Sequence, residues 1–222
     1  MNVLVVAAHP DDEVLGCGAT IAHHAETGDA VEILILGTGA LSRDGAGPGE
    51  TERLAGQAAE AARILGARRA RVLDLPDNRF DGVDLLEIVR RVEVEIQGLR
   101  PEIVYTHHAG DLNVDHRRTF QAVLTACRPQ ASGGVRKILS FEVPSSTEWQ
   151  SPTSGHGFRP NVFVDVGRTL ARKEAALAAY VDEVRPFPHP RSPEAVRALG
   201  IWRGASAGFP AAEAFELVRE LL

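Results

Sequence analysis

The hydrophobic positions of the chain form short apolar runs that alternate with longer stretches of helical periodicity. Residues 3–8 and 31–36 are nearly continuous apolar runs, the second interrupted only by Glu32, and such runs are typical of strands buried on both faces of a sheet. Four further runs predict strands at residues 71–75, 103–106, 137–143 and 162–166.

Helical spacing fills the segments between these strands. It predicts helices at residues 19–26, 50–65, 83–99 and about 117–127, and then at 168–181 and 211–222 around a proline-dense stretch at 185–193. This β-α-β-α order predicts an α/β fold with a mostly parallel sheet flanked by helices. Because no composition break or internal repeat divides the sequence, we expect a single domain over residues 1–222.

Two segments, 41–49 and 145–160, contain Gly, Ser and Pro and follow neither periodicity. Long connections of this kind often carry function, so we expect these segments to form rims or lids of a site.

Composition and charge narrow the possible partners and the compartment. The net charge is −6 and the basic residues are scattered, which argues against nucleic acid or an anionic membrane as a partner. Only two cysteines occur, so no disulfide framework is indicated. Residues 1–8 lack a basic leader and no run of about 18 apolar residues occurs. We therefore expect a cytoplasmic protein without membrane insertion.

Candidate chemistry begins where the first predicted strand ends, in His9-Pro10-Asp11-Asp12-Glu13. The carboxyl ends of strands in a parallel sheet are where ligands bind. The proline keeps His9 extended, so that His9 and Asp12 can converge, and one imidazole with one carboxylate makes up two thirds of a catalytic zinc shell. Asp11 can then serve as an acid/base group. The alternative, an acidic N-cap cluster, requires neither the histidine nor two adjacent aspartates.

A second polar cluster follows the predicted strand at 103–106. His116 lies at the start of a helix and can supply a third metal ligand, while Asp115 or Asn113 can orient the ligands. The cluster consists of His107, His108, Asp111, Asn113, Asp115 and His116.

These motifs resemble those of the PIG-L/LmbE-type zinc-dependent N-deacetylases. The resemblance covers residues 8–13 with 16–20, the stretch 113–116, Arg53 with the helix ending at 65–66, and residues 75–77. It implies a Rossmann-like fold and activity on N-acetylglucosamine conjugates or related amino sugars. It also implies these roles: zinc ligands His9, Asp12 and His116, and general base Asp11.

One position departs from the family pattern. Many members carry a histidine three residues before the last zinc ligand, where this chain has Asn113. An amide can donate a hydrogen bond but cannot shuttle a proton at neutral pH. His108, which shares the loop with His116, is the preferred candidate for the leaving-group acid, with His107 and His189 as alternatives.

Three residues are candidates for substrate binding. Arg53, at the start of a helix beside the expected site, suits a hydroxyl, carboxylate or phosphate, although without the resemblance it is better explained as an exposed helical charge. Residues 183–192 resemble a subset of bacterial members, which makes His189 and Arg191 candidates. The same stretch also suits a rigid proline-bearing connection between helices.

The sequence therefore predicts a zinc-dependent amidohydrolase that deacetylates a small N-acetylated sugar or its conjugate. A homo-oligomer is compatible with it. Two other classes stay open: a non-haem Fe(II) enzyme, since two histidines and one carboxylate also match that triad, and a noncatalytic metal- or nucleotide-binding module. The sequence contains no Walker loop, Gly-x-Ser-x-Gly elbow or His-Glu-x-x-His helix.

Overall fold

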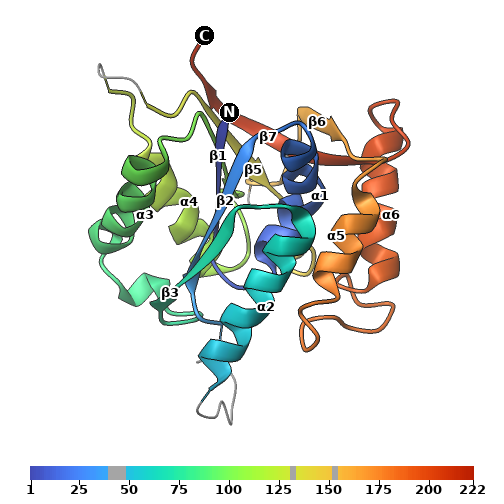
Figure 1. Cartoon of the computed structure of the whole chain (residues 1–222), viewed down its shortest axis with the longest axis horizontal. Helices are drawn as coiled ribbons and strands as arrows, with labels where there is room; N and C mark the ends of the chain where they lie inside the picture. The colour runs from blue at the N-terminus through green and yellow to red at the C-terminus, as the bar shows by residue number, and fades with distance from the viewer. Residues whose placement is uncertain (40–48, 131–133, 152–154) are drawn as a thin grey trace.

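The computed structural model of the chain describes residues 1–39, 49–130, 134–151 and 155–222. The expected rim segment 41–49 therefore lies outside the described residues except at Gly49. Helices cover both faces of one seven-stranded sheet (Figure 1). No helix in the described part of the chain is both long and apolar enough to cross a membrane.

The sheet has the strand order β3-β2-β1-β4-β5-β7-β6. The five strands from β3 to β5 are parallel, and β7 pairs antiparallel with both β5 and β6. The mostly parallel α/β fold is thereby confirmed. The strands are β1 (Asn2–Ala7), β2 (Ala30–Gly37), β3 (Arg69–Leu75), β4 (Ile103–His107), β5 (Lys137–Phe141), β6 (Val162–Asp165) and β7 (Ala212–Glu220).

The helices form two layers. Figure 1 shows α3 and α4 on one face of the sheet, and α1, α2, α5 and α6 on the other. The helices are α1 (Asp12–Glu26), α2 (Glu50–Leu65), α3 (Leu85–Leu99), α4 (Val114–Ala126), α5 (Leu170–Leu177) and α6 (Pro193–Ala205), with short 3-10 turns η1 (Phe80–Gly82) and η2 (Thr147–Trp149).

Strand β1 explains why the apolar run is unbroken. Val3 and Val5 belong to the core under α1, α2 and α5, whereas Leu4 and Val6 belong to the core under α3 and α4. Successive side chains of a strand point to opposite faces, so a central strand with helices on both faces must be apolar at every position. The polar residues that follow β1 therefore lie beyond the core, at the carboxyl edge of the sheet.

The prediction of a helix at 211–222 is wrong, because this segment contains strand β7. Its sequence, AEAFELVRE, consists largely of good helix formers, whose preference is weak enough to be overridden by tertiary contacts. Here β7 completes the hydrogen bonding of both β5 and β6. Helix α6, which follows the proline-dense stretch, was not predicted. Among the boundaries, α1 begins at Asp12 rather than 19, and α5 ends at Leu177 rather than 181.

Candidate active site

A sharp turn carries the chain from β1 into α1. Asp11 is the residue before the helix and has a left-handed backbone, with φ of 98°, which is rare for a residue with a side chain. Its N–H donates to Glu13 Oε2 at 3.1 Å, and its C=O accepts from Val14 and Leu15 at 3.0 and 2.9 Å. These bonds hold Asp11 and Asp12 at the start of α1, directly beyond the sheet edge.

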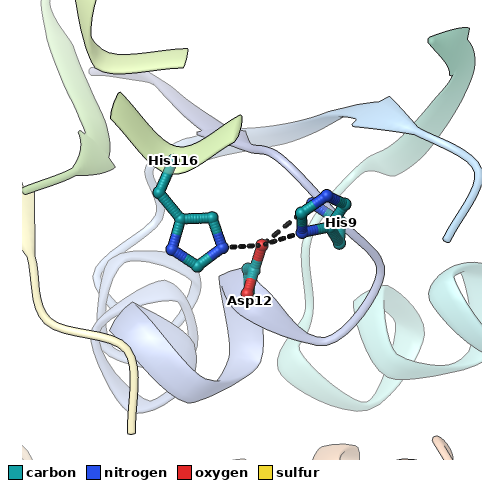
Figure 2. Close-up of side chains that lie close together, drawn as sticks. All are labelled: His9, Asp12 and His116. Atoms are coloured by element: carbon teal, nitrogen blue, oxygen red, sulfur yellow. Dashed lines mark hydrogen bonds and ion pairs between the residues drawn. The ribbon is translucent and has the colours of Figure 1, made fainter. Parts of the chain in front are cut away.

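Three side chains, from the turn after β1, from α1 and from α4, converge at this edge. Asp12 Oδ2 lies 3.4 Å from His9 Nδ1 and 3.2 Å from His116 Nε2 (Figure 2). One ligand atom from each residue falls within 4.8 Å of the other two. Within the described part of the chain, the buried Asp12 Oδ1 has no hydrogen-bond partner. Two imidazoles and a carboxylate, one of whose buried oxygens has no hydrogen-bond partner among the described residues, fit a metal ion.

Other carboxylates fix the orientation of both imidazoles. His9 Nε2 lies 2.9 Å from Asp77 Oδ1 and 2.8 Å from Asp115 Oδ2, while His116 Nδ1 lies 3.1 Å from Asp111 Oδ1. An ionised carboxylate only accepts hydrogen bonds, so these ring nitrogens are the donors. The remaining nitrogen of each ring faces the carboxylate between the two histidines, so a metal bound there would meet its lone pair once the proton is displaced.

Each charge in this group shifts the pKa of its neighbours. Burial alone would raise the pKa of Asp12, but His116 and His9 outweigh it and hold this pKa well below its ordinary value. Burial likewise lowers the pKa of His116, whereas Asp12 and Asp111 raise it to about 9. A metal must displace the proton of such an imidazole, so we expect metal affinity to fall as pH falls.

The carboxylate that orients His116 is held by the turn η2, a contact that sequence patterns do not reveal. Thr147 Oγ1 donates to Asp111 Oδ2 at 2.5 Å and Ser146 Oγ donates to Asp111 Oδ1. Burial acts to raise the pKa of Asp111, but His116 and the two hydroxyls lower it below its ordinary value. The segment 145–160, expected to form a rim, thus contacts the site at its first residues.

A polar cavity of about 230 Å³ opens beside the three residues. Arg191 Nη1 lies 2.8 Å from Asp11 Oδ2, at the wall of this cavity. Burial raises the pKa of Asp11 to about 7, against the lowering effect of Arg191. The cavity is lined by His9, Pro10, Asp11, Asp12, Gly39, Leu54, Asp77, Asn78, Asn113, Glu183, Arg185 and Arg191.

Helix α1 is broken at Cys17, which has φ of −147°, and a buried ion pair fills the break. Lys173 Nζ donates to the C=O of Leu15 at 2.8 Å and lies 2.6 Å from Glu213 Oε1. Glu213 Oε2 accepts from the N–H of Thr20 at 2.6 Å. The pair therefore satisfies backbone groups left open on both sides of the break, and it holds the short helical segment that carries Asp12.

A second buried contact supports the turn at Asp11. The hydroxyl of Tyr180 donates to Glu13 Oε1 at 2.5 Å, while Glu13 Oε2 accepts from Asp11 N–H. Burial raises the pKa of Glu13 to about 7, and the Tyr180 hydrogen bond opposes this rise. Lys173 and Tyr180 lie in a segment with ordinary helical spacing, and Glu213 lies in the segment predicted as a helix, so sequence reasoning missed all three.

The remaining candidate residues take different positions. His108 Nδ1 lies 2.7 Å from Glu216 Oε2 and its Nε2 lies 2.8 Å from the C=O of His156, so both ring nitrogens are engaged away from the cavity. Asn113 caps α4 by accepting from Asp115 N–H at 2.8 Å, and it lines the cavity.

Arg53 and His189 are not among the described residues that line the cavity. Arg53 pairs with Glu50 and Asp182. His189 Nδ1 accepts from the N–H of Arg191 at 3.1 Å, which links it to the cavity wall.

Comparison with known proteins decides the family. The model of the PIG-L family, described as GlcNAc-PI de-N-acetylase, matches residues 4–127. This is more than half of the chain and includes His9, Asp11, Asp12 and His116. The chain belongs to the PIG-L family.

Two curated relatives are similar to this family member. It is 32% identical over 172 residues to the "Uncharacterized deacetylase YaiS" of Escherichia coli strain K12, covering 74% of this chain and 82% of the relative. It is 29% identical over 171 residues to the 1D-myo-inositol 2-acetamido-2-deoxy-alpha-D-glucopyranoside deacetylase of Kineococcus radiotolerans, covering 61% of this chain. The aligned part spans 47% of that longer relative.

A solved structure shows that the fold extends over the whole chain. GalB, the 4-carboxy-2-hydroxymuconate hydratase from Pseudomonas putida KT2440, matches with a TM-score of 0.80, covering 100% of this chain and 97% of GalB, at 23% identity. At this identity the likeness concerns the fold alone. Because the fold also carries a hydratase, the reaction must be argued from the family and the site.

Proposed function

We propose that this PIG-L family member removes the acetyl group from an N-acetylated amino sugar or a small conjugate of it. The convergence of His9, Asp12 and His116 beside Asp11 carries the proposal, because His9, Asp11 and Asp12 line a polar cavity. The family description and the deacetylase names of the two curated relatives support it.

We assign zinc to the group formed by His9 Nδ1, Asp12 and His116 Nε2. When bound, zinc polarises an amide carbonyl and lowers the pKa of a water molecule toward about 7. The chain's own part is to present two neutral imidazoles with fixed tautomers, which the hydrogen bonds to Asp115, Asp77 and Asp111 secure.

Asp11 is the proposed general base. Its pKa of about 7 suits proton transfer near neutral pH, because such a group is partly deprotonated and still basic. Asp11 Oδ2 would take the proton of the attacking water and then return it to the departing amine. Both ring nitrogens of His108 are engaged by Glu216 and a backbone carbonyl. We therefore assign both proton transfers to Asp11.

Two cavity residues would position the substrate. The Asn113 amide group donates to Asn78 Oδ1 at 3.3 Å, a long bond that a substrate carbonyl could replace. Arg191, held between Asp11 and Ser145, would both orient the base and bind a hydroxyl of the sugar.

The proposal is tested by acetate release from N-acetylglucosamine, its glycosides and its inositol conjugate, with the zinc-loaded enzyme. In Asp11→Asn we expect kcat to fall by about 10² to 10⁴, the loss typical of removing an acid/base group, with bound zinc retained. Asp81→Asn, an exposed aspartate on η1, serves as the matched control and should keep wild-type turnover.

Two results would contradict this assignment. Normal turnover by Asp11→Asn would leave Asp11 as a residue of the turn only. Hydration of an unsaturated tricarboxylic acid such as 4-carboxy-2-hydroxymuconate, without acetate release from any acetamido sugar, would instead assign the chain the reaction named for GalB.

A further inference from the structure

Two loops lie next to the cavity, connected through Arg191 of the cavity wall, and the first carries a tryptophan. The turn η2 is anchored at one end by Thr147, which donates to Asp111 at 2.5 Å. It is anchored at the other end by Gln150 Nε2, which donates to the C=O of Gly110 at 3.0 Å. Trp149 lies between these anchors, so its position is tied to the carboxylate that orients His116.

The second loop connects α5 to α6 and is tied to the base. Arg191 Nη1 contacts Asp11 at 2.8 Å, and its Nε donates to Ser145 Oγ of the first loop at 2.7 Å. The N–H of Arg191 donates to the ring of His189. Arg191 therefore joins the two loops and holds His189 next to the cavity wall.

The loops meet at an aromatic contact. The rings of Trp149 and His189 lie edge to face, with centroids 6.1 Å apart and an interplanar angle of 83°. Trp149 nevertheless stays 53% exposed, so a large apolar surface faces solvent beside a polar cavity. Among the described residues that line the cavity itself, none is Phe, Tyr or Trp.

We propose that Trp149 and His189 form an aromatic subsite that binds one ring of the group conjugated to the acetamido sugar. The proposal rests on the proposed deacetylase function and adds to it the two side chains that would contact a ring next to the acetylated sugar. An exposed indole face stacks against the flat apolar face of a sugar, a cyclitol or an aryl ring. The subsite's place at the rim puts this ring outside the cavity.

The size of the cavity supports placing the acetylated sugar inside it and the second ring outside it. Its volume of about 230 Å³ is below the roughly 300 Å³ at which pockets for drug-sized ligands begin, so it suits the acetylated sugar and leaves the second ring at the rim. Trp149 and His189 are a single platform, which favours one further ring over a long polysaccharide.

Steady-state kinetics on matched glycosides test the subsite. The substrates are the methyl, phenyl and glucosyl glycosides of N-acetylglucosamine. For Trp149→Ala we expect KM to rise about 3- to 10-fold for the ring-bearing glycosides, with kcat unchanged and the methyl glycoside unaffected. Trp149→Phe should recover most of the loss. Trp202→Ala is the control. Trp202 is also exposed, at 67%, but it lies on α6, roughly 13 Å along the helix from the loop that carries His189.

The outcomes separate the subsite from the reaction. A KM increase for either or both ring-bearing glycosides supports the subsite, and the larger increase identifies the preferred ring. An equal change for the methyl glycoside, or no change for any glycoside, overturns it.

In Trp202→Phe, Trp149 is the only tryptophan, so quenching of its fluorescence by the phenyl glycoside measures binding without turnover. Quenching without acetate release would support the subsite and reject the deacetylase function. Acetate release without quenching would support the deacetylase function and reject the subsite.

Discussion

The N-terminal and C-terminal regions of the chain contribute to the site in different ways. The region from β1 to α4 supplies the groups to which we assign the chemistry, namely His9, Asp11, Asp12 and His116. They come from two strand ends of a parallel sheet, and this edge collects functional groups in such folds.

The C-terminal region, from β5 to β7, supplies groups that hold these residues in place. Lys173 and Glu213 fill the break in α1, Tyr180 holds Glu13, and Arg191 contacts Asp11. The chemistry is therefore local in the sequence, whereas its placement depends on contacts between residues more than 150 positions apart. Variants of the N-terminal region should therefore change the chemistry itself, whereas variants of the C-terminal region should change the stability and placement of the reacting groups.

The largest effect on stability is expected for the buried ion pair. Lys173→Met leaves the Glu213 carboxylate buried without its partner, which should lower the free energy of unfolding by about 3 to 5 kcal/mol. The chain's other lysine offers a matched control, since Lys137 pairs with Glu220 and both are about one-third exposed. Lys137→Met should cost no more than about 1 kcal/mol. Chemical denaturation measures both, and equal losses would show that the break in α1 does not depend on the pair.

A smaller effect is expected at the turn of Asp11. Tyr180→Phe removes the hydroxyl that donates to the buried Glu13, so the free energy of unfolding should fall by about 1 to 3 kcal/mol and kcat should fall because the turn loses its support. Tyr105→Phe removes a hydroxyl that contacts His24 Nε2 at 3.0 Å, away from the cavity. That variant should keep the wild-type kcat. If both variants keep it, the contact between Tyr180 and Glu13 has no part in placing Asp11.

The smallest effect concerns the pair His108 and Glu216. Burial lowers the pKa of His108, but the hydrogen bond with Glu216 outweighs it and raises this pKa above its ordinary value of 6.5. The folded protein thus holds the proton more tightly than the unfolded chain. The resulting stability is fully present below pH 6.5 and is lost as pH rises through the folded pKa.

Denaturation at pH 6 and pH 9 checks this sign. Because Glu216 is partly exposed, His108→Gln should reduce the pH difference by no more than about 1 kcal/mol. Glu216→Gln should remove the same dependence, and the double variant should add nothing further. A larger pH dependence in His108→Gln than in the wild type would reverse the assigned direction.

The sequence predicted the N-terminal region well because several independent signals agree there. The apolar run of β1 ends at a polar cluster, and the parallel topology brings this end next to the end of β4. His9, Asp12 and His116 therefore lie together as predicted, although their roles as metal ligands stay a prediction. The sequence showed that Asn113 departs from the family pattern. It did not show whether His108 can act as the acid instead, because the contacts of His108 depend on Glu216 of β7.

In the C-terminal region the strands β5 and β6 were predicted, but the last strand was predicted wrongly for a physical reason. Ala, Glu and Leu favour a helix locally, whereas antiparallel pairing with β5 and β6 makes residues 212–220 a strand. This pairing places Glu213 opposite the break in α1 and Glu216 beside His108. Without β7, neither contact can be inferred from spacing, and the role of Lys173 stays hidden too.

The central claim is that His9, Asp12 and His116 hold one metal ion, and calorimetric titration of the metal-free protein with zinc tests it directly. The wild type should bind about one zinc per chain. His116→Gln should weaken this binding at least about 100-fold, whereas His24→Gln, at the opposite end of α1, should bind as the wild type does. Full affinity and stoichiometry in His116→Gln would contradict the claim.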